Sequence, residues 1–162
     1  MSRSAVYAAE DQWSAVLDRG GVVDFFGSRI DVPVQRRFGD LDGVRRYVDL
    51  VMGLPAVQAE FSGAASPTVR ERSGQTRAHY EPDTATIAIP LREFWAGREA
   101  VVLHELTHHL MGRPVGGAPV EWHGAEYRTA MCRLVGCVLG ESASLLLRAG
   151  YEEAGLAVPV AR

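Results

Sequence analysis

The chain has 162 residues, of which 47% are hydrophobic, and a formal net charge of −3. This length and apolar content predict a single domain, residues 1–162, that is large enough to bury a core without disulfide bonds. The weak net charge excludes the strongly basic surface that recruits nucleic acid or a membrane.

The composition and the N-terminus also limit where the protein works. All 17 basic residues are arginines and asparagine is absent, a bias that indicates a high-GC genome rather than a phosphate-binding surface. The start, MSRSAVYAAEDQW, reaches Glu10 and Asp11 before any apolar core of signal-peptide length, and no apolar run approaches the roughly 20 residues of a membrane span. Cys132 and Cys137 lie about 140° apart on a helix and are predicted to be reduced, buried thiols. We therefore expect a cytoplasmic protein with no membrane partner.

The first third of the chain predicts two helices and one strand. Apolar residues recur at helical spacing over residues 5–18. The run RIDVPVQ alternates apolar and polar residues and predicts a strand over 29–35, in which Pro33 favours an edge position. Asp40 is typical of an N-cap and predicts a helix over 41–53.

The remaining two thirds predict a small sheet followed by helices. Three strand-like runs within 66–90 (TVRER, TRAHYEP and TATIAIP) are separated by turn residues and predict a small antiparallel sheet. A helix is predicted over 92–111, then a loop (GRPVGGAP, 112–119), and then helices over 122–138 and 141–154. This order predicts an α+β fold, with the small sheet packed on the 92–111 helix and further helices at its flanks.

The helix over 92–111 contains an H-E-x-x-H motif, formed by His104, Glu105 and His108 within the apolar stretch VVLHELTHHL. Residues four apart lie about 6 Å from each other on one helix face, so both imidazoles can bind one metal ion. Two imidazoles suit zinc, which keeps an open position for water in catalytic sites. Glu105 is rotated off that line and can reach the water as a general base. A bound metal would also offset the cost of burying these polar groups.

A catalytic zinc needs a third protein ligand. His123, in WHGAEY, begins the next predicted helix, and the intervening Gly/Pro-rich loop allows the chain to fold back. Glu121 and Glu126 are alternatives, because many H-E-x-x-H enzymes take a glutamate from the following helix; His123 is preferred. Glu126 could instead accept the other ring N–H of a ligand histidine, or be a first-turn glutamate stabilised by the helix dipole. His109 lies about 100° around the helix from His108 and is expected to point elsewhere.

The sequence does not decide which residues fill two further roles of a hydrolytic site, the donor to the oxyanion and the strand that binds substrate. Tyr80, Tyr127 and His79 are candidate donors to the developing oxyanion, although such residues more often serve in packing than in catalysis. The run TATIAIP is either an edge strand that holds an extended peptide by β-addition or an ordinary core strand.

The motif HELTHHL followed by HGAEY resembles the SprT-like zinc metallopeptidases, which pair an H-E-x-x-H helix with an H-G-x-E-F-type segment. Tyr127 occupies the position of their aromatic residue. The layout is also similar to small putative metallohydrolases of actinobacteria, in agreement with the high-GC composition. The resemblance covers residues 80–135 and implies a compact zincin-type core with Glu105 as base and three zinc ligands, His104, His108 and His123. SprT-like proteins often add a zinc ribbon or DNA-binding region, but this chain has no CxxC pairs, so no nucleic-acid partner is expected.

The expected function is therefore a zinc metallopeptidase acting on a peptide or protein substrate. Zinc would lower the pKa of its bound water and polarise the substrate carbonyl, while Glu105 passes a proton to the leaving amine. A hydrolase of non-peptide amides would use the same groups, and a non-catalytic protein would hold a purely structural zinc. Three protein ligands plus water would indicate catalysis, whereas four protein ligands would indicate a structural role.

Overall fold

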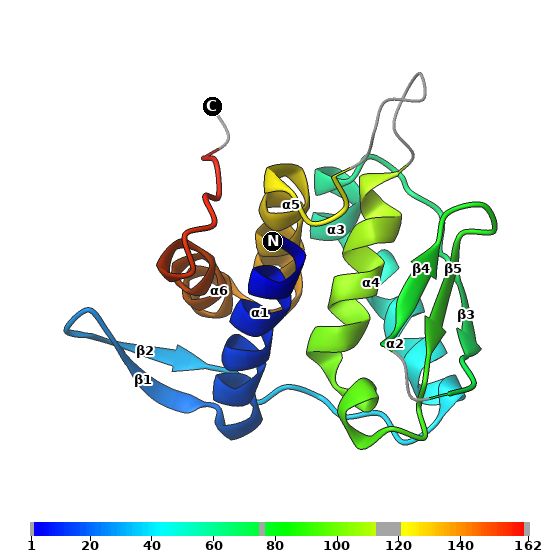
Figure 1. Cartoon of the computed structure of the whole chain (residues 1–162), viewed down its shortest axis with the longest axis horizontal. Helices are drawn as coiled ribbons and strands as arrows, with labels where there is room; N and C mark the ends of the chain where they lie inside the picture. Colours follow the sequence, from blue (N-terminus) through cyan, green and yellow to red (C-terminus); the bar gives the residue numbers. More distant parts are fainter. Residues whose placement is uncertain (1, 75–76, 113–120, 161–162) are drawn as a thin grey trace. The chain divides into compact units, whose positions relative to one another are not determined.

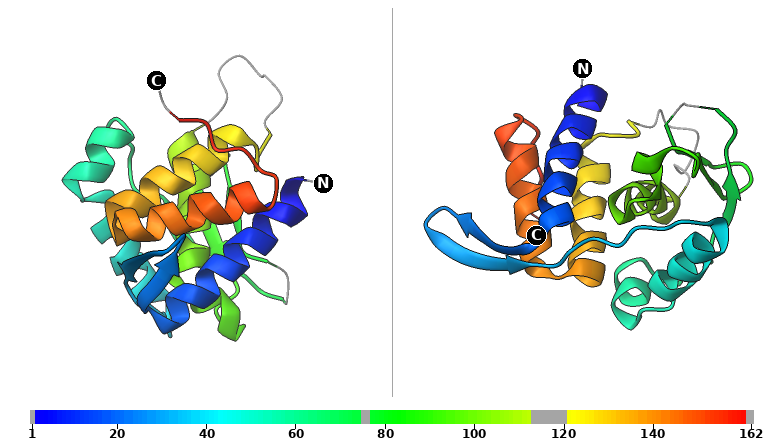
Figure 2. Two further views of the ribbon diagram at one scale, coloured as in Figure 1. Left: turned by 90° about the vertical axis from the view of Figure 1, so that its left-hand side faces the viewer. Right: turned by 90° about the horizontal axis from the view of Figure 1, so that it is seen from below.

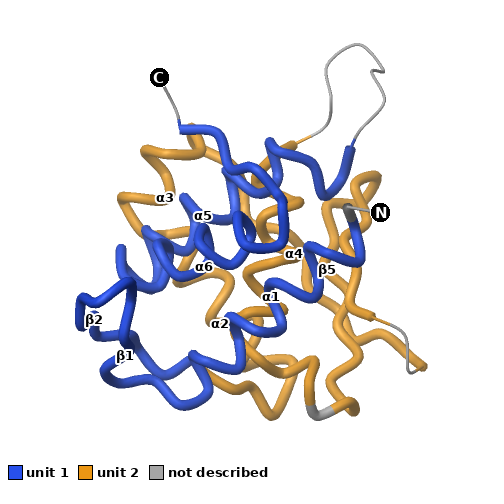
Figure 3. Tube along the Cα trace, turned by 60° about the vertical axis from the view of Figure 1, so that its left-hand side comes forward, with its two compact units in different colours: residues 1–35, 121–162 blue, residues 36–120 orange. Residues whose placement is uncertain are grey.

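The computed structural model describes residues 2–74, 77–112 and 121–160 (Figure 1). The chain divides into two compact units, residues 1–35 with 121–162 and residues 36–120, here called unit 1 and unit 2 (Figure 3). Helices and two small sheets confirm the predicted α+β class. In the described part of the chain, no helix is both long and apolar enough to cross a membrane. The single-domain assignment stays a prediction, and the predicted loop over 112–119 lies, beyond Gly112, outside the described residues.

Unit 1 is built from three helices and a β-hairpin: α1 (Ser2–Arg19), α5 (Ala125–Leu139), α6 (Glu141–Glu153), β1 (Gly21–Phe25) and β2 (Ser28–Val32). Gly140 alone separates α5 from α6. These two helices pack against each other, and α1 packs on α6 (Figure 2). Apolar side chains at helical spacing make the buried face of each helix. The buried apolar residues of these three helices include Val6, Trp13, Leu17, Met131, Leu134, Ala143 and Leu147.

The hairpin was only half predicted. β2 overlaps the strand predicted over 29–35 but begins one residue earlier and ends at Val32, directly before Pro33, whereas β1 was not predicted. The strands pair antiparallel, with Phe25 opposite Ser28. The two turn residues, Phe26 and Gly27, both have positive φ (50° and 84°), as a type I′ turn requires. Asparagine normally occupies the first of these positions, so the sequence lacked the usual hairpin signal.

Unit 2 contains a three-stranded sheet and the helix of the H-E-x-x-H motif. In chain order its elements are α2 (Leu41–Met52), α3 (Pro55–Glu60), β3 (Thr68–Glu71), β4 (His79–Glu81), β5 (Thr86–Ile89), the 3-10 helix η1 (Phe94–Gly97) and α4 (Glu99–Met111). The short helix α3 was not predicted. α4 packs on β4, β5 and α2, and α2 also packs on β3.

The sheet of unit 2 is mixed rather than wholly antiparallel. Its strand order is β3-β5-β4, and β5 runs parallel to β3 and antiparallel to β4. All four residues of β5 are buried. The run TATIAIP is therefore the central core strand, and its alternative assignment as an edge strand was wrong.

Predicted helix ends are right for α2 and wrong for the start of α4. Asp40 caps α2 as expected, since its Oδ1 accepts a hydrogen bond from the Gly43 N–H at 2.6 Å. α4 begins at Glu99 and not at residue 92. The preceding residues are held off the helix because the Phe38 N–H donates to the Gly97 carbonyl at 2.7 Å. A Cβ on Gly97 would lie 2.5 Å from the Phe38 carbonyl oxygen, so only glycine permits this approach.

A fully buried carboxylate fixes the start of α4 against α2. Glu99, 0% exposed, accepts hydrogen bonds from the Arg36 N–H at 2.8 Å, from Arg36 Nη1 at 3.0 Å and from the Tyr47 hydroxyl at 2.5 Å. Its negative charge also lies in the first turn of α4, where the helix dipole favours it. Burial, followed by the charge of Glu99, raises the pKa of Tyr47 well above its usual value. The helix that carries the motif is therefore anchored at its N-terminus.

Candidate metal centre

The motif lies in a helix that is buried on nearly all sides. Ten of the 13 residues of α4 are buried. Among them are the motif residues His104, Glu105 and His108, which are 3%, 3% and 5% exposed. The three side chains offer two imidazoles and a carboxylate. Burying such groups is favourable only when each has a suitable partner.

The two motif histidines face each other across one turn of α4. Their rings are tilted by 70°, with centroids 5.0 Å apart, and the two Nε2 atoms lie 3.3 Å from each other. Two nitrogen ligands of one tetrahedral zinc, each 2.0–2.1 Å from the ion, are separated by about 3.3–3.4 Å. The same separation also fits one N–H···N hydrogen bond between neutral imidazoles. The separation is therefore compatible with either arrangement.

His109 is oriented away from this pair by two hydrogen bonds of its own. Its Nε2 lies 2.6 Å from the Ala65 carbonyl oxygen, which can only accept, so this nitrogen carries the proton. Nδ1 is then the acceptor for the Tyr80 hydroxyl at 3.0 Å. These contacts join α4 to β4 and to the segment before β3. The prediction that His109 points elsewhere is confirmed.

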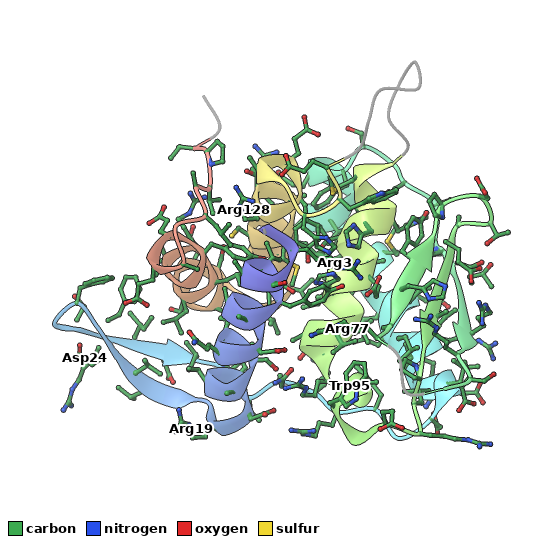
Figure 4. The ribbon with its side chains drawn as sticks, in the orientation of Figure 1. Arg3, Arg19, Asp24, Arg77, Trp95 and Arg128 are labelled. Carbon is green, nitrogen blue, oxygen red and sulfur yellow. The ribbon has the colours of Figure 1, made fainter. Side chains whose placement is uncertain are left out.

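His123 belongs to unit 1, where aromatic rings hold it just before α5. Its imidazole is half-buried between Tyr7 of α1 and Tyr127 of α5, with centroid distances of 5.3 and 5.2 Å. Its backbone carbonyl accepts a hydrogen bond from Arg128 Nη1 at 3.0 Å; Arg128 is labelled in Figure 4. Both the ring and the backbone of His123 are therefore fixed within unit 1. The sequence did not reveal that Tyr7 packs against this ring.

The rival ligands Glu121 and Glu126 are both exposed. Glu126 lies in the first turn of α5, where a negative charge is favoured by the helix dipole. The carboxylate of Glu121 lies over Gly124, because a Cβ at that position would be 2.7 Å from Oε2. Glycine in HGAEY thus makes room for the preceding glutamate at the start of the helix.

The three candidate oxyanion donors all have partners within their own units. Tyr80 donates to His109, as described above. The Tyr127 hydroxyl donates to Glu10 Oε1 at 2.9 Å. His79 Nε2 lies 2.9 Å from Glu81 Oε1, and Arg70 also pairs with that oxygen. His79 and Arg70 lower the pKa of the Glu81 carboxyl.

Glu10 is a buried polar residue that sequence analysis missed as an anchor. It is 6% exposed, and its Oε1 also accepts the Tyr151 hydroxyl at 2.5 Å. One carboxylate oxygen therefore links α1 to α5 and α6. Its position on the apolar face of α1, between Val6 and Trp13, is the signal that could have revealed it.

His104 and His108 belong to unit 2 and His123 to unit 1, so the three-histidine ligand set stays a prediction. Comparisons with protein-family models, with curated proteins and with solved structures find no match to this chain. The resemblance to SprT-like peptidases accordingly rests on the two motifs, and the function has to be argued from the chemistry of the residues.

Proposed function

We propose that the chain is a zinc-dependent metallopeptidase in which His104, His108 and His123 each give one ring nitrogen to the metal. Glu105 is its general base. The observation that carries the proposal is the buried histidine pair, whose Nε2 atoms are 3.3 Å apart in a helix anchored at its N-terminus. A pair of imidazoles turned toward each other inside a buried helix has the donor type and the spacing that zinc requires.

A bound zinc would supply a Lewis acid that polarises a carbonyl and makes water a nucleophile near neutral pH. The chain supplies the rest of the chemistry. Glu105 follows His104 directly in the sequence and is 3% exposed, so its carboxylate is shielded from bulk solvent. Its Oε atom would accept a proton from the attacking water and deliver it to the nitrogen of the leaving amine.

The sheet of unit 2 offers a strand edge on which an extended peptide could lie. β4 pairs with β5 on one side, and among the described strands its other side has no partner. Tyr80 of β4 is joined to His109, the residue after His108, so this strand is fixed to α4. We propose β4, in place of the central β5, as the strand that pairs with substrate through backbone hydrogen bonds.

The test compares the wild type with Glu105→Gln, His104→Ala and Glu60→Gln after loading each protein with zinc. Elemental analysis gives the zinc content, and hydrolysis of a peptide library followed by mass spectrometry gives the turnover. Glu105→Gln keeps its size but loses the proton acceptor, so zinc should stay bound while turnover falls by about 10²- to 10⁴-fold. Glu60 is exposed on α3, and its change should alter neither quantity.

His104→Ala should lose both zinc and activity, because two protein ligands hold the ion too weakly. Equal turnover by the wild type and Glu105→Gln would remove Glu105 from the mechanism. Zinc binding without hydrolysis of any peptide would contradict the peptidase assignment, and cleavage of small non-peptide amides in the same assay would replace it with an amidase.

A further inference from the structure

Unit 1 contains a groove that plays no part in the proposed hydrolysis. It has a volume of about 300 Å³ and lies among α1, the tip of the β1–β2 hairpin and α6. Its apolar walls include Trp13 and Val16 of α1, Phe25 and Phe26 of the hairpin, and Leu146 and Ala149 of α6. The Trp13 indole is fixed in place, since its Nε1 donates to the Ala143 carbonyl at 2.9 Å. The groove thus has a preformed apolar floor.

The charged residues of the groove are both acidic. Asp24 lies on the hairpin (labelled in Figure 4) and Glu153 on the last turn of α6. Both are exposed, and none of the described residues that line the groove is basic. Arg29 lies opposite Asp24 in the hairpin register but is not part of the lining. An apolar floor with two carboxylates at its margin is complementary to a ligand that is apolar and positively charged.

The tip of the hairpin carries a residue that the fold itself does not favour. Phe26 has a φ of +50° at the first position of the type I′ turn and is 87% exposed. A bulky side chain in this region costs on the order of 1 kcal/mol or more, whereas asparagine adopts it readily. Within the hairpin the ring makes an edge-to-face contact with Phe25 at a centroid distance of 4.9 Å, but most of its surface stays open to solvent. Backbone strain at an exposed aromatic residue beside a groove points to a contact made with another molecule.

We propose that this groove is a docking site for a peptide segment of another protein, in which an aliphatic or aromatic side chain is followed by arginine or lysine. The apolar side chain enters between Trp13 and Leu146, and Phe26 covers it from the hairpin. The basic side chain pairs with Asp24 and Glu153. A volume of about 300 Å³ is at the small end for an enclosed ligand pocket but fits one anchoring side chain of the kind that dominates protein interfaces.

This proposal is independent of the metal centre, and its test uses the full chain with or without zinc. Three fluorescein-labelled decapeptides serve as probes: one with Leu-Phe followed by two arginines, one with Leu-Phe followed by two glutamates, and one with Ala-Ala followed by two arginines. Fluorescence anisotropy at 50 mM and 200 mM salt measures binding. The first peptide should bind about tenfold or more tightly than each of the others, because both the anchor and the charge contribute.

Matched variants separate the groove from the rest of the surface. Asp24→Asn combined with Glu153→Gln should weaken the first peptide about tenfold and reduce its salt dependence. Asp31→Asn combined with Glu152→Gln removes the same charge from neighbouring exposed positions outside the groove and should leave binding unchanged. Asn at residue 24 can still accept the turn hydrogen bond that Asp24 takes from the Gly27 N–H at 3.2 Å, so the hairpin is retained.

Phe26→Asn gives the sharpest readout, because folding and binding should change in opposite directions. It relieves the strain of the turn, so the melting temperature should stay the same or rise, while affinity for the first peptide should fall about tenfold. Val22→Thr, on the same hairpin but outside the groove, should leave the affinity within about twofold. Equal binding of all three peptides, equal effects of the groove and control variants, or no binding of the first peptide would each overturn the proposal.

Discussion

At the scale of single residues, the most informative side chain outside α4 is Glu10. Its Oε1 accepts the hydroxyls of Tyr127 and Tyr151 in the buried part of unit 1. Glu10→Ala leaves both hydroxyls buried without their acceptor, so we expect a loss of about 2–4 kcal/mol in the free energy of unfolding. Asp49→Ala, at an exposed position of α2, should change it by less than about 0.5 kcal/mol. Urea denaturation measures both, and equal values would show that the carboxylate is no anchor.

The buried thiol of Cys132 and the buried hydroxyl of Tyr151 predict that the protein loses stability at alkaline pH. Burial raises the pKa of the Cys132 thiol from 9.0 to about 12, and burial followed by the charge of Glu10 raises the pKa of Tyr151 well above 10.0. Well below pH 9 both groups are protonated in the folded and the unfolded chain. As the pH rises, the unfolded chain releases protons that the folded chain retains, so the free energy of unfolding falls.

The thiol alone should give a slope approaching about 1.4 kcal/mol per pH unit once the pH exceeds 9, and the tyrosine should add to it above pH 10. Cys132→Ala should remove the part of the pH-dependent loss of stability that begins near pH 9. Cys137→Ala, at a partly exposed thiol, serves as the control. Urea denaturation at pH 8, 9, 10 and 11 measures the slopes. An unchanged slope in Cys132→Ala would contradict burial as the cause.

At the scale of elements, the position of α4 depends on the contact between Glu99 and Tyr47. Tyr47→Phe keeps the ring, which packs 4.9 Å from that of Phe38, and removes only the hydroxyl. The buried carboxylate of Glu99 then retains its bonds to Arg36 alone. We expect the free energy of unfolding to fall by about 1.5–3 kcal/mol, as for a hydrogen bond to a charged group. Hydrogen exchange of the first turn of α4 should quicken in parallel, and unaltered exchange would show that other contacts position the helix.

Local chemistry made some elements predictable. The apolar period of α1, the capping residue Asp40 and the Gly140 break between α5 and α6 are local signals, and each element was predicted within a few residues. The start of α4 was not, because the apolar period continues through residues that a backbone contact with Phe38 holds outside the helix. The central place of β5 depends on its parallel pairing with β3, which is a long-range contact without a local signal.

In the candidate site, too, local features could be predicted from the sequence and long-range contacts could not. The spacing of His104 and His108 is a property of one helix, and the sequence was sufficient to place the two side chains on one face. The hydrogen bonds of His109 to Tyr80 and Ala65 depend on how the sheet packs on α4. The aromatic contacts of His123 depend on how α1 packs beside α5. Neither follows from residue types alone.

At the scale of the whole molecule, the proposed ligand set draws on both compact units. Zinc held by α4 and His123 should therefore stabilise the entire chain, by about 2.7 kcal/mol when free zinc is 100 times its dissociation constant. Calorimetry with zinc and with chelator measures this gain. His123→Ala should abolish it, whereas Glu126→Ala should weaken zinc about 10- to 100-fold at most. The reverse ranking would make Glu126 the third ligand, and a melting temperature indifferent to chelator would contradict the coupling.

X-ray absorption spectroscopy at the zinc edge is the decisive measurement for the proposed site, because it reports the atoms around the metal in the intact protein. We expect three imidazole nitrogens at about 2.0–2.1 Å and one further light atom from solvent. Four protein ligands, or a sulfur at about 2.3 Å from either cysteine, would indicate a structural zinc and contradict the proposed hydrolase.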